Sequence, residues 1–109
     1  MEIKLIKPLK LEDKEIQEID LKLEDLTGAD ILKVDLEIRA EGDPRGFDNV
    51  YNQKVLLILA SKATGIIVED LEKLSAPDFL EVTFTVRNFL MGLSAQTEEP
   101  KNSDESLLN

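Results

Sequence analysis

Two short stretches near the N-terminus decide the fold: IKLIKPLKL at residues 3–11 and IDLKL at residues 19–23. In both, apolar residues alternate with charged ones, which is the pattern of a strand with one buried face and one face in water. A polar segment at residues 12–14 separates them. The pattern predicts an antiparallel β-hairpin over about residues 3–23. Pro8 has no backbone N–H to donate, so it predicts either an edge strand or a bulge at that point.

A helix start signal follows the hairpin directly, in the sequence LTGAD at residues 26–30. Thr27 and Asp30 can form a capping box, with the carboxylate at the positive end of the helix. Residues 32–40, however, alternate between apolar and charged in the manner of a strand, so the two local signals conflict. The cap and the charged helix formers favour a helix over about residues 28–41.

A loop rich in glycine and proline precedes the longest apolar run of the chain, Val55–Ala60. This run predicts a buried central helix over about residues 50–64. Gly65 stands where a left-handed C-terminal cap is expected. A further short helix is expected over about residues 68–74.

The last helix is predicted over about residues 76–92. Ser75, Pro77 and Asp78 give a cap, an early proline and an acid in the first turn. Residues 80–86 also alternate in strand fashion, but the cap and the length favour a helix. Residues 94–109 are polar, acidic and without periodicity, which is typical of a mobile, disordered tail.

The predicted fold class is therefore α+β, with an N-terminal two-stranded antiparallel β-hairpin followed by three to four α-helices. The length of 109 residues fits a single folded domain at residues 1–93, with the acidic tail at 94–109.

Composition excludes several kinds of site. The chain has no cysteine and no histidine, which removes thiolate nucleophiles, imidazole bases, disulfides and the usual zinc ligands. Its net charge of −10 opposes binding to nucleic acid and to anionic membranes. No apolar run is long enough to span a bilayer or to form a signal peptide. We therefore expect a cytoplasmic protein that binds neither nucleic acid nor membrane.

Acidic residues are the remaining candidates for chemistry. Glu41, Asp43, Asp48 and Asn49 share one loop, but their spacing does not match a calcium-binding loop and Arg45 lies among them. Glycine-rich phosphate loops are also absent from the sequence. We expect no catalytic, cofactor-binding or metal-binding residues, and no cofactor.

The last predicted helix carries more apolar surface than a small core can cover, and this surplus indicates contact with another chain. We expect self-association, and the candidate interaction surface consists of Phe79, Val82, Phe84, Val86, Phe89 and Leu93.

The order and spacing of several short segments give the chain a family resemblance. These segments are Lys7-Pro8, residues 21–30, Ala60–Gly65, Glu69-Asp70-Leu71 with Leu74, and Asp78–Gly92. Together they resemble the small tail assembly chaperones of tailed phages and prophages, over about residues 3–92.

The resemblance implies a non-enzymatic protein that binds the tape measure protein and keeps it soluble in the bacterial cytoplasm while the tail assembles. Two other hypotheses remain open. One is a structural tail or head-tail joining subunit of the virion, and the other is a small metal-dependent enzyme that uses Asp43 and Asp48.

Overall fold

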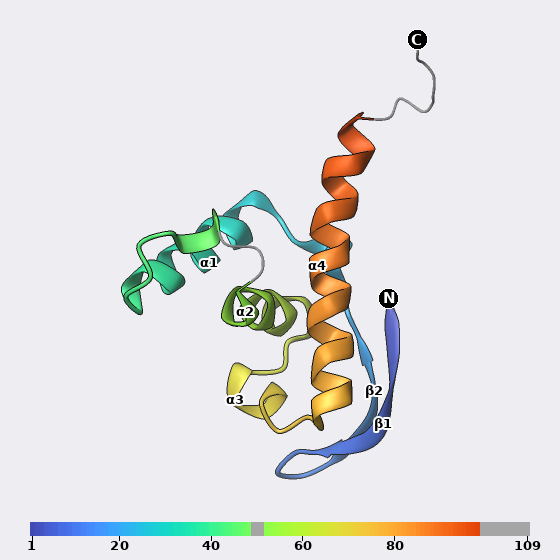
Figure 1. Cartoon of the computed structure of the whole chain (residues 1–109). Helices are drawn as coiled ribbons and strands as arrows, with labels where there is room; N and C mark the ends of the chain where they lie inside the picture. Colours follow the sequence, from blue (N-terminus) through green and yellow to red (C-terminus); the bar gives the residue numbers. More distant parts are fainter. Residues whose placement is uncertain (49–51, 99–109) are drawn as a thin grey trace.

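The computed structural model describes residues 1–48 and 52–98, and the side chains of residues 1–47 and 52–92. The described part contains a β-hairpin followed by four α-helices, which confirms the predicted α+β class (Figure 1). The element order is β1 (Glu2–Lys10), β2 (Glu15–Asp20), a 3₁₀ turn η1 (Leu23–Asp25), α1 (Gly28–Ala40), a 3₁₀ turn η2 (Gly46–Asp48), α2 (Gln53–Thr64), α3 (Val68–Leu71) and α4 (Ala76–Glu98).

The hairpin pairs β1 with β2 antiparallel, and Ile3 lies opposite Ile19. Both of these side chains are buried, so the alternating pattern sends one face of the hairpin into the core. The register shifts between Lys4 and Leu9, which places a bulge around Pro8. The described sheet consists of these two strands, so β1 is also an edge strand, and the structure shows both consequences predicted for Pro8.

The conflict at residues 32–40 is resolved in favour of the helix. The Thr27 side chain accepts from the Asp30 N–H, and the Asp30 side chain accepts from the Thr27 N–H, so the capping box is complete. Helical geometry then divides the alternating apolar residues between two faces. Val34 and Ile38 are buried, whereas Leu32 and Leu36 are 66% and 67% exposed.

Helix α2 is the centre of the core and lies between α1, α3 and α4 (Figure 1). Every residue from Val55 to Ala60 is buried. Asn52 caps its start, accepting from the Lys54 N–H, so the helix begins three residues later than the predicted position 50. Gly65 has φ 79° and closes the other end as predicted.

The last two helices differ from the prediction at their ends. Helix α3 ends at Leu71 rather than at about residue 74, because the chain turns there and buries Leu74 before α4 begins. Helix α4 starts as predicted but runs to Glu98, past the predicted end at residue 92. Residues 93–98 contain neither glycine nor proline, so no residue in this stretch breaks the helix. The first residues of the predicted tail are thus helical, and residues 99–109 lie outside the described part.

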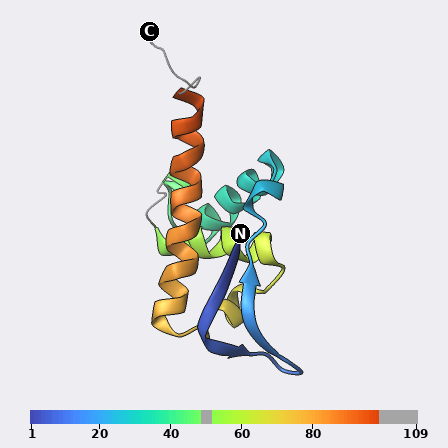
Figure 2. The ribbon, with the colours of Figure 1, turned by 90° about the vertical axis from the view of Figure 1, so that its right-hand side faces the viewer.

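Asp78 connects the two ends of the fold. Its carboxylate accepts from the backbone N–H of Ile6 at 2.9 Å, from that of Lys7 at 3.0 Å and from the Ser75 hydroxyl at 3.0 Å. The side chain is only 2% exposed. The N–H groups that the bulge leaves outside the β-ladder are therefore satisfied by the first turn of α4, which packs beside the hairpin (Figure 2).

We predict that Asp78→Asn lowers the free energy of unfolding by about 2 kcal/mol, because an amide replaces a charged acceptor of buried hydrogen bonds. Urea denaturation measures this change. Glu81→Gln is the matched control, since Glu81 is an exposed acid on the next turn of α4. It should change the free energy of unfolding by less than about 0.5 kcal/mol.

The difference in unfolding free energy between wild type and Asp78→Asn should depend on pH. The hydrogen bond from the Ile6 N–H, followed by those from Lys7 and Ser75, holds the pKa of Asp78 below its usual value against the opposing effect of burial. A lowered folded-state pKa stabilises the fold above the unfolded pKa of about 4 and loses this effect as the pH falls through the folded value. The stability gap between wild type and Asp78→Asn should therefore narrow below about pH 4. A constant gap down to about pH 2 contradicts this role.

Candidate functional site

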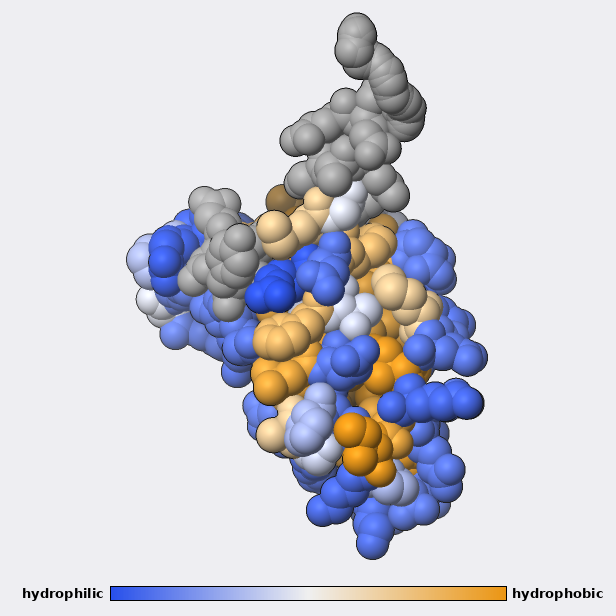
Figure 3. Space-filling model, turned by 45° about the vertical axis from the view of Figure 1, so that its right-hand side comes forward, coloured by the Kyte–Doolittle hydropathy of each residue, from blue (hydrophilic) through white to orange (hydrophobic). Residues whose placement is uncertain are grey.

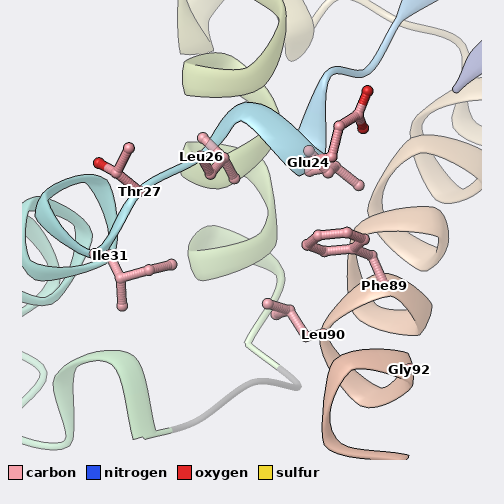
Figure 4. Close-up of a pocket in the computed structure, with 9 residues that line it drawn as sticks. Glu24, Leu26, Thr27, Ile31, Phe89, Leu90 and Gly92 are labelled. Atoms are coloured by element: carbon pink, nitrogen blue, oxygen red, sulfur yellow. The ribbon is translucent and has the colours of Figure 1, made fainter. Parts of the chain in front are cut away.

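An apolar groove lies between the start of α1 and the C-terminal half of α4 (Figure 4). Its volume is about 670 Å³, which is within the range of small binding pockets. Leu26 and Ile31 line one wall, and Phe89 and Leu90 line the other. In Figure 4 the two α4 side chains point across the groove toward the wall that carries Leu26 and Ile31.

The capping box positions the first wall. Thr27 is the N-cap of α1, so Leu26 precedes the cap and Ile31 occupies the fourth helical position. These are the two positions that lie together in a hydrophobic staple. The backbone N–H of Thr27 donates to Asp30 at 2.9 Å and holds the pKa of that carboxyl below its usual value. The ionised cap fixes the direction in which the chain enters α1, and so places both apolar side chains on one wall.

The second wall belongs to the part of α4 that leaves the core. Val86 is fully buried, whereas Phe89 and Leu90, one turn later, are only partly buried. Beyond them α4 projects away from the rest of the molecule (Figures 1 and 2). The groove therefore opens where the helix loses its neighbours.

Polar groups lie at the border of the groove rather than on its apolar walls. Glu24 and Thr27 contribute to its lining, and neither is buried. An apolar surface bordered by polar groups, in a chain of net charge −10, fits an apolar segment of a partner. A second hollow of about 500 Å³ lies between the hairpin and the α2–α3 connection. Lys14, Glu18 and Asp70 are among its lining residues, so it offers a less apolar surface.

The structure does not bring the six residues of the predicted interaction surface together on one face. Val82 and Val86 have no exposed surface and belong to the core, so in the folded chain they are not available to a partner. Phe79 and Phe89 are partly buried against that core, and Phe84 is 39% exposed on the other side of α4. Leu93 is part of α4, but its side chain lies outside the described part.

A second apolar surface, which we call the outer stripe, lies on α4 opposite the core. It consists of Leu80, Phe84 and Met91, which are 40%, 39% and 48% exposed, together with the half-buried Arg87. The Arg87 guanidinium lies over the Phe84 ring at 4.7 Å from its centroid, so the cation covers part of the ring. Figure 3 shows apolar side chains gathered along this side of the molecule, with hydrophilic ones beside them.

Sequence reasoning included Phe89 but missed Leu26, Ile31 and Leu90. The capping signal contained the missing information for two of them, because Thr27 as N-cap makes Leu26 and Ile31 a staple pair. That α4 lies opposite this pair is a long-range contact, and no local pattern indicates it.

The acidic residues have structural roles in the described part. Asp35 accepts from the Phe47 N–H at 2.8 Å and from Arg39 at 3.0 Å, which ties the loop after α1 back to the helix and lowers the pKa of Asp35. Asp43 accepts from the Arg45 N–H and from Asn52.

Among the residues that the structure describes, no group of three or more acids is placed to hold a metal ion. The side chains of Asp48 and Asn49, weighed above as calcium ligands, lie outside the described part. No described helix is both long enough and apolar enough to cross a membrane.

Comparison with known proteins identifies the family. Searches of curated proteins and of solved structures found no match. A family model described as phage tail assembly chaperone proteins, E, or 41 or 14, matches residues 2–91, which include the hairpin and both walls of the groove. Since the match extends over most of the chain, the protein belongs to the phage tail assembly chaperone family.

Proposed function

We propose that this chaperone binds the tape measure protein of a tailed phage or prophage and keeps it soluble in the bacterial host cytoplasm during tail assembly. The role is non-enzymatic. The observation that carries the proposal is the groove, which leaves Phe89, Leu90, Leu26 and Ile31 partly exposed to a partner in a strongly acidic chain.

The chemistry of the groove indicates the kind of client segment. A groove lined by leucine, isoleucine and phenylalanine suits the apolar face of an amphipathic helix. Covering that face shields it from other copies of the client, because exposed apolar patches are what drive aggregation. The charge of −10 then keeps the complex soluble through repulsion between complexes.

We also propose that the chain self-associates. Three large apolar residues of the outer stripe stay exposed on α4 while the opposite face of the same helix fills the core. The groove and the outer stripe lie on different sides of α4, so a client and a second copy can bind at the same time.

We predict that co-expression raises the amount of soluble tape measure protein and that Leu26→Gln with Leu90→Gln removes this effect. Each leucine loses an apolar contact worth about 1.5–3 kcal/mol when buried, so binding should weaken at least about tenfold per substitution. Affinity chromatography of the co-expressed pair measures the loss. Leu32→Gln is the control, because Leu32 is exposed on α1 outside the groove. Equal losses in the control and the double variant would exclude the groove.

We predict that the complex resists salt. Added salt weakens exposed charge pairs, because the Debye length falls from about 10 Å at 0.1 M to about 3 Å at 1 M. Apolar contacts do not weaken in this way. The dissociation constant should therefore change less than about threefold between 0.1 and 0.5 M sodium chloride. Fluorescence anisotropy with a labelled client fragment provides the measurement. Dissociation at moderate salt would show that charge, not the groove, holds the client.

We predict that purified virions lack this protein, because a chaperone leaves once the tail is built. Quantitative mass spectrometry of virions decides the matter. A structural tail or head-tail joining subunit, which is the alternative, would instead be present in many copies. Major tail proteins in the same sample serve as the internal control.

A further inference from the structure

The outer stripe has the spacing of a helix-pairing seam. Leu80, Phe84, Arg87 and Met91 follow one another at intervals of four, three and four residues. This alternation of threes and fours keeps side chains in line along one side of a helix, as in coiled coils. Val82 and Val86, on the opposite side, are fully buried, so α4 has two apolar faces and the core covers only one.

The spacing of the stripe is the same in both directions along the helix, and this symmetry indicates what covers the stripe. Because the intervals are palindromic, an antiparallel copy of α4 presents them in the same order. We infer that the partner of this face is a second copy of the chain, paired antiparallel about a two-fold axis that crosses α4 between residues 85 and 86. This inference rests on the proposed self-association and specifies its interface.

The pairing satisfies each residue of the stripe. Leu80 of one copy lies beside Met91 of the second copy, so two exposed apolar side chains cover each other. Phe84 lies beside Arg87 of the second copy, and Arg87 already rests on the Phe84 ring of its own chain. Each guanidinium therefore lies between two aromatic faces, which is a favourable place for a cation.

Charges beside the stripe are compatible with this arrangement. Glu81 and Asn88 lie on the same side of it, one turn before and one turn after its centre, and both are exposed. With this axis the residue of the second copy that is level with Glu81 is Leu90; on the side of the seam where Glu81 lies, Asn88 of the second copy is two positions from that level, whereas its Glu81 is nine positions away. Two strongly acidic chains thus meet without opposing carboxylates at the seam, and the only basic residue of α4, Arg87, lies within it.

Size and charge set the expected affinity. The stripe from Leu80 to Met91 extends about 16 Å along one helix at 1.5 Å per residue. A single helix pair of this length covers less than the roughly 800 Å² per partner of a standard stable interface. We therefore expect a weak dimer, with a dissociation constant in the micromolar to millimolar range. Salt should strengthen it, because screening reduces the repulsion between two chains of charge −10.

The sequence contains no cysteine, so introduced cysteines can test which residues lie beside each other in the dimer. We predict a specific disulfide between residues 80 and 91 of the two copies. Leu80→Cys and Met91→Cys variants, distinguished by mass tags, are mixed in equal amounts and oxidised. The Leu80→Cys chain should link to the Met91→Cys chain in clear excess over either homodisulfide. Leu36→Cys, at a residue that is 67% exposed on α1, is the control and should form no comparable link.

Phe84→Asp gives a second measurement on the full chain. Sedimentation velocity from micromolar to millimolar protein should show a weak dimer for wild type and for Leu36→Asp. The dissociation constant of Phe84→Asp should rise at least about tenfold, because a charge enters the centre of the seam. Circular dichroism checks that the variant remains folded.

The outcomes distinguish the proposed self-association from the proposed antiparallel interface. A wild-type chain that stays monomeric up to millimolar concentration would overturn both self-association and this interface. A dimer that survives Phe84→Asp, or that links Leu80→Cys preferentially to itself, would leave self-association standing and overturn the antiparallel pairing. Client binding through the groove is measured independently of either result.

Discussion

The arrangement of the whole chain depends on the hydrogen bonds that the Asp78 carboxylate accepts from the β-hairpin. The carboxylate is almost fully buried, and it satisfies the backbone N–H groups of Ile6 and Lys7, which the bulge in β1 leaves outside the ladder. The bulge, Pro8 and the first turn of α4 therefore form one unit, although more than half of the chain separates them. Because α4 is anchored at its first turn, its position determines which of its faces enters the core, which lines the groove and which faces solvent.

Hydrogen bonds of a carboxylate also position one wall of the groove. Thr27 and Asp30 exchange hydrogen bonds at the start of α1, and this exchange orients the segment that carries Leu26 and Ile31. On the other side, α4 passes out of the core at Phe89 and Leu90. The groove is thus built from two helix ends, one held by a cap and the other by burial. Neither end needs a partner to form, so under the proposed function the groove exists before a client arrives, and little ordering is required when the client binds.

Three of the acidic residues have clear structural roles. Asp30, Asp35 and Asp78 each accept a backbone N–H, and these bonds hold the pKa of all three below the usual value. Carboxylates stabilised in the ionised form are poor proton donors near neutral pH. Their charge instead fixes helix starts and a loop, while the remaining acids keep the surface strongly negative. Membership of the tail assembly chaperone family agrees with this use of acidic residues.

Local patterns determined the elements, and tertiary contacts decided the surfaces. Alternation at residues 3–23, the Thr27–Asp30 cap, the apolar run Val55–Ala60 and the Ser75–Asp78 start signal were sufficient for the hairpin and the helices, because each depends on neighbours within a few residues. They could not tell which apolar residues of α4 stay exposed. Val82 and Phe84 are two positions apart and both apolar, yet α2 and the hairpin pack against one side of α4, which buries Val82 and leaves Phe84 39% exposed. The groove likewise exists only because the fold brings Leu26 opposite Phe89, and contact between residues so far apart in the chain is decided by packing, not by local periodicity.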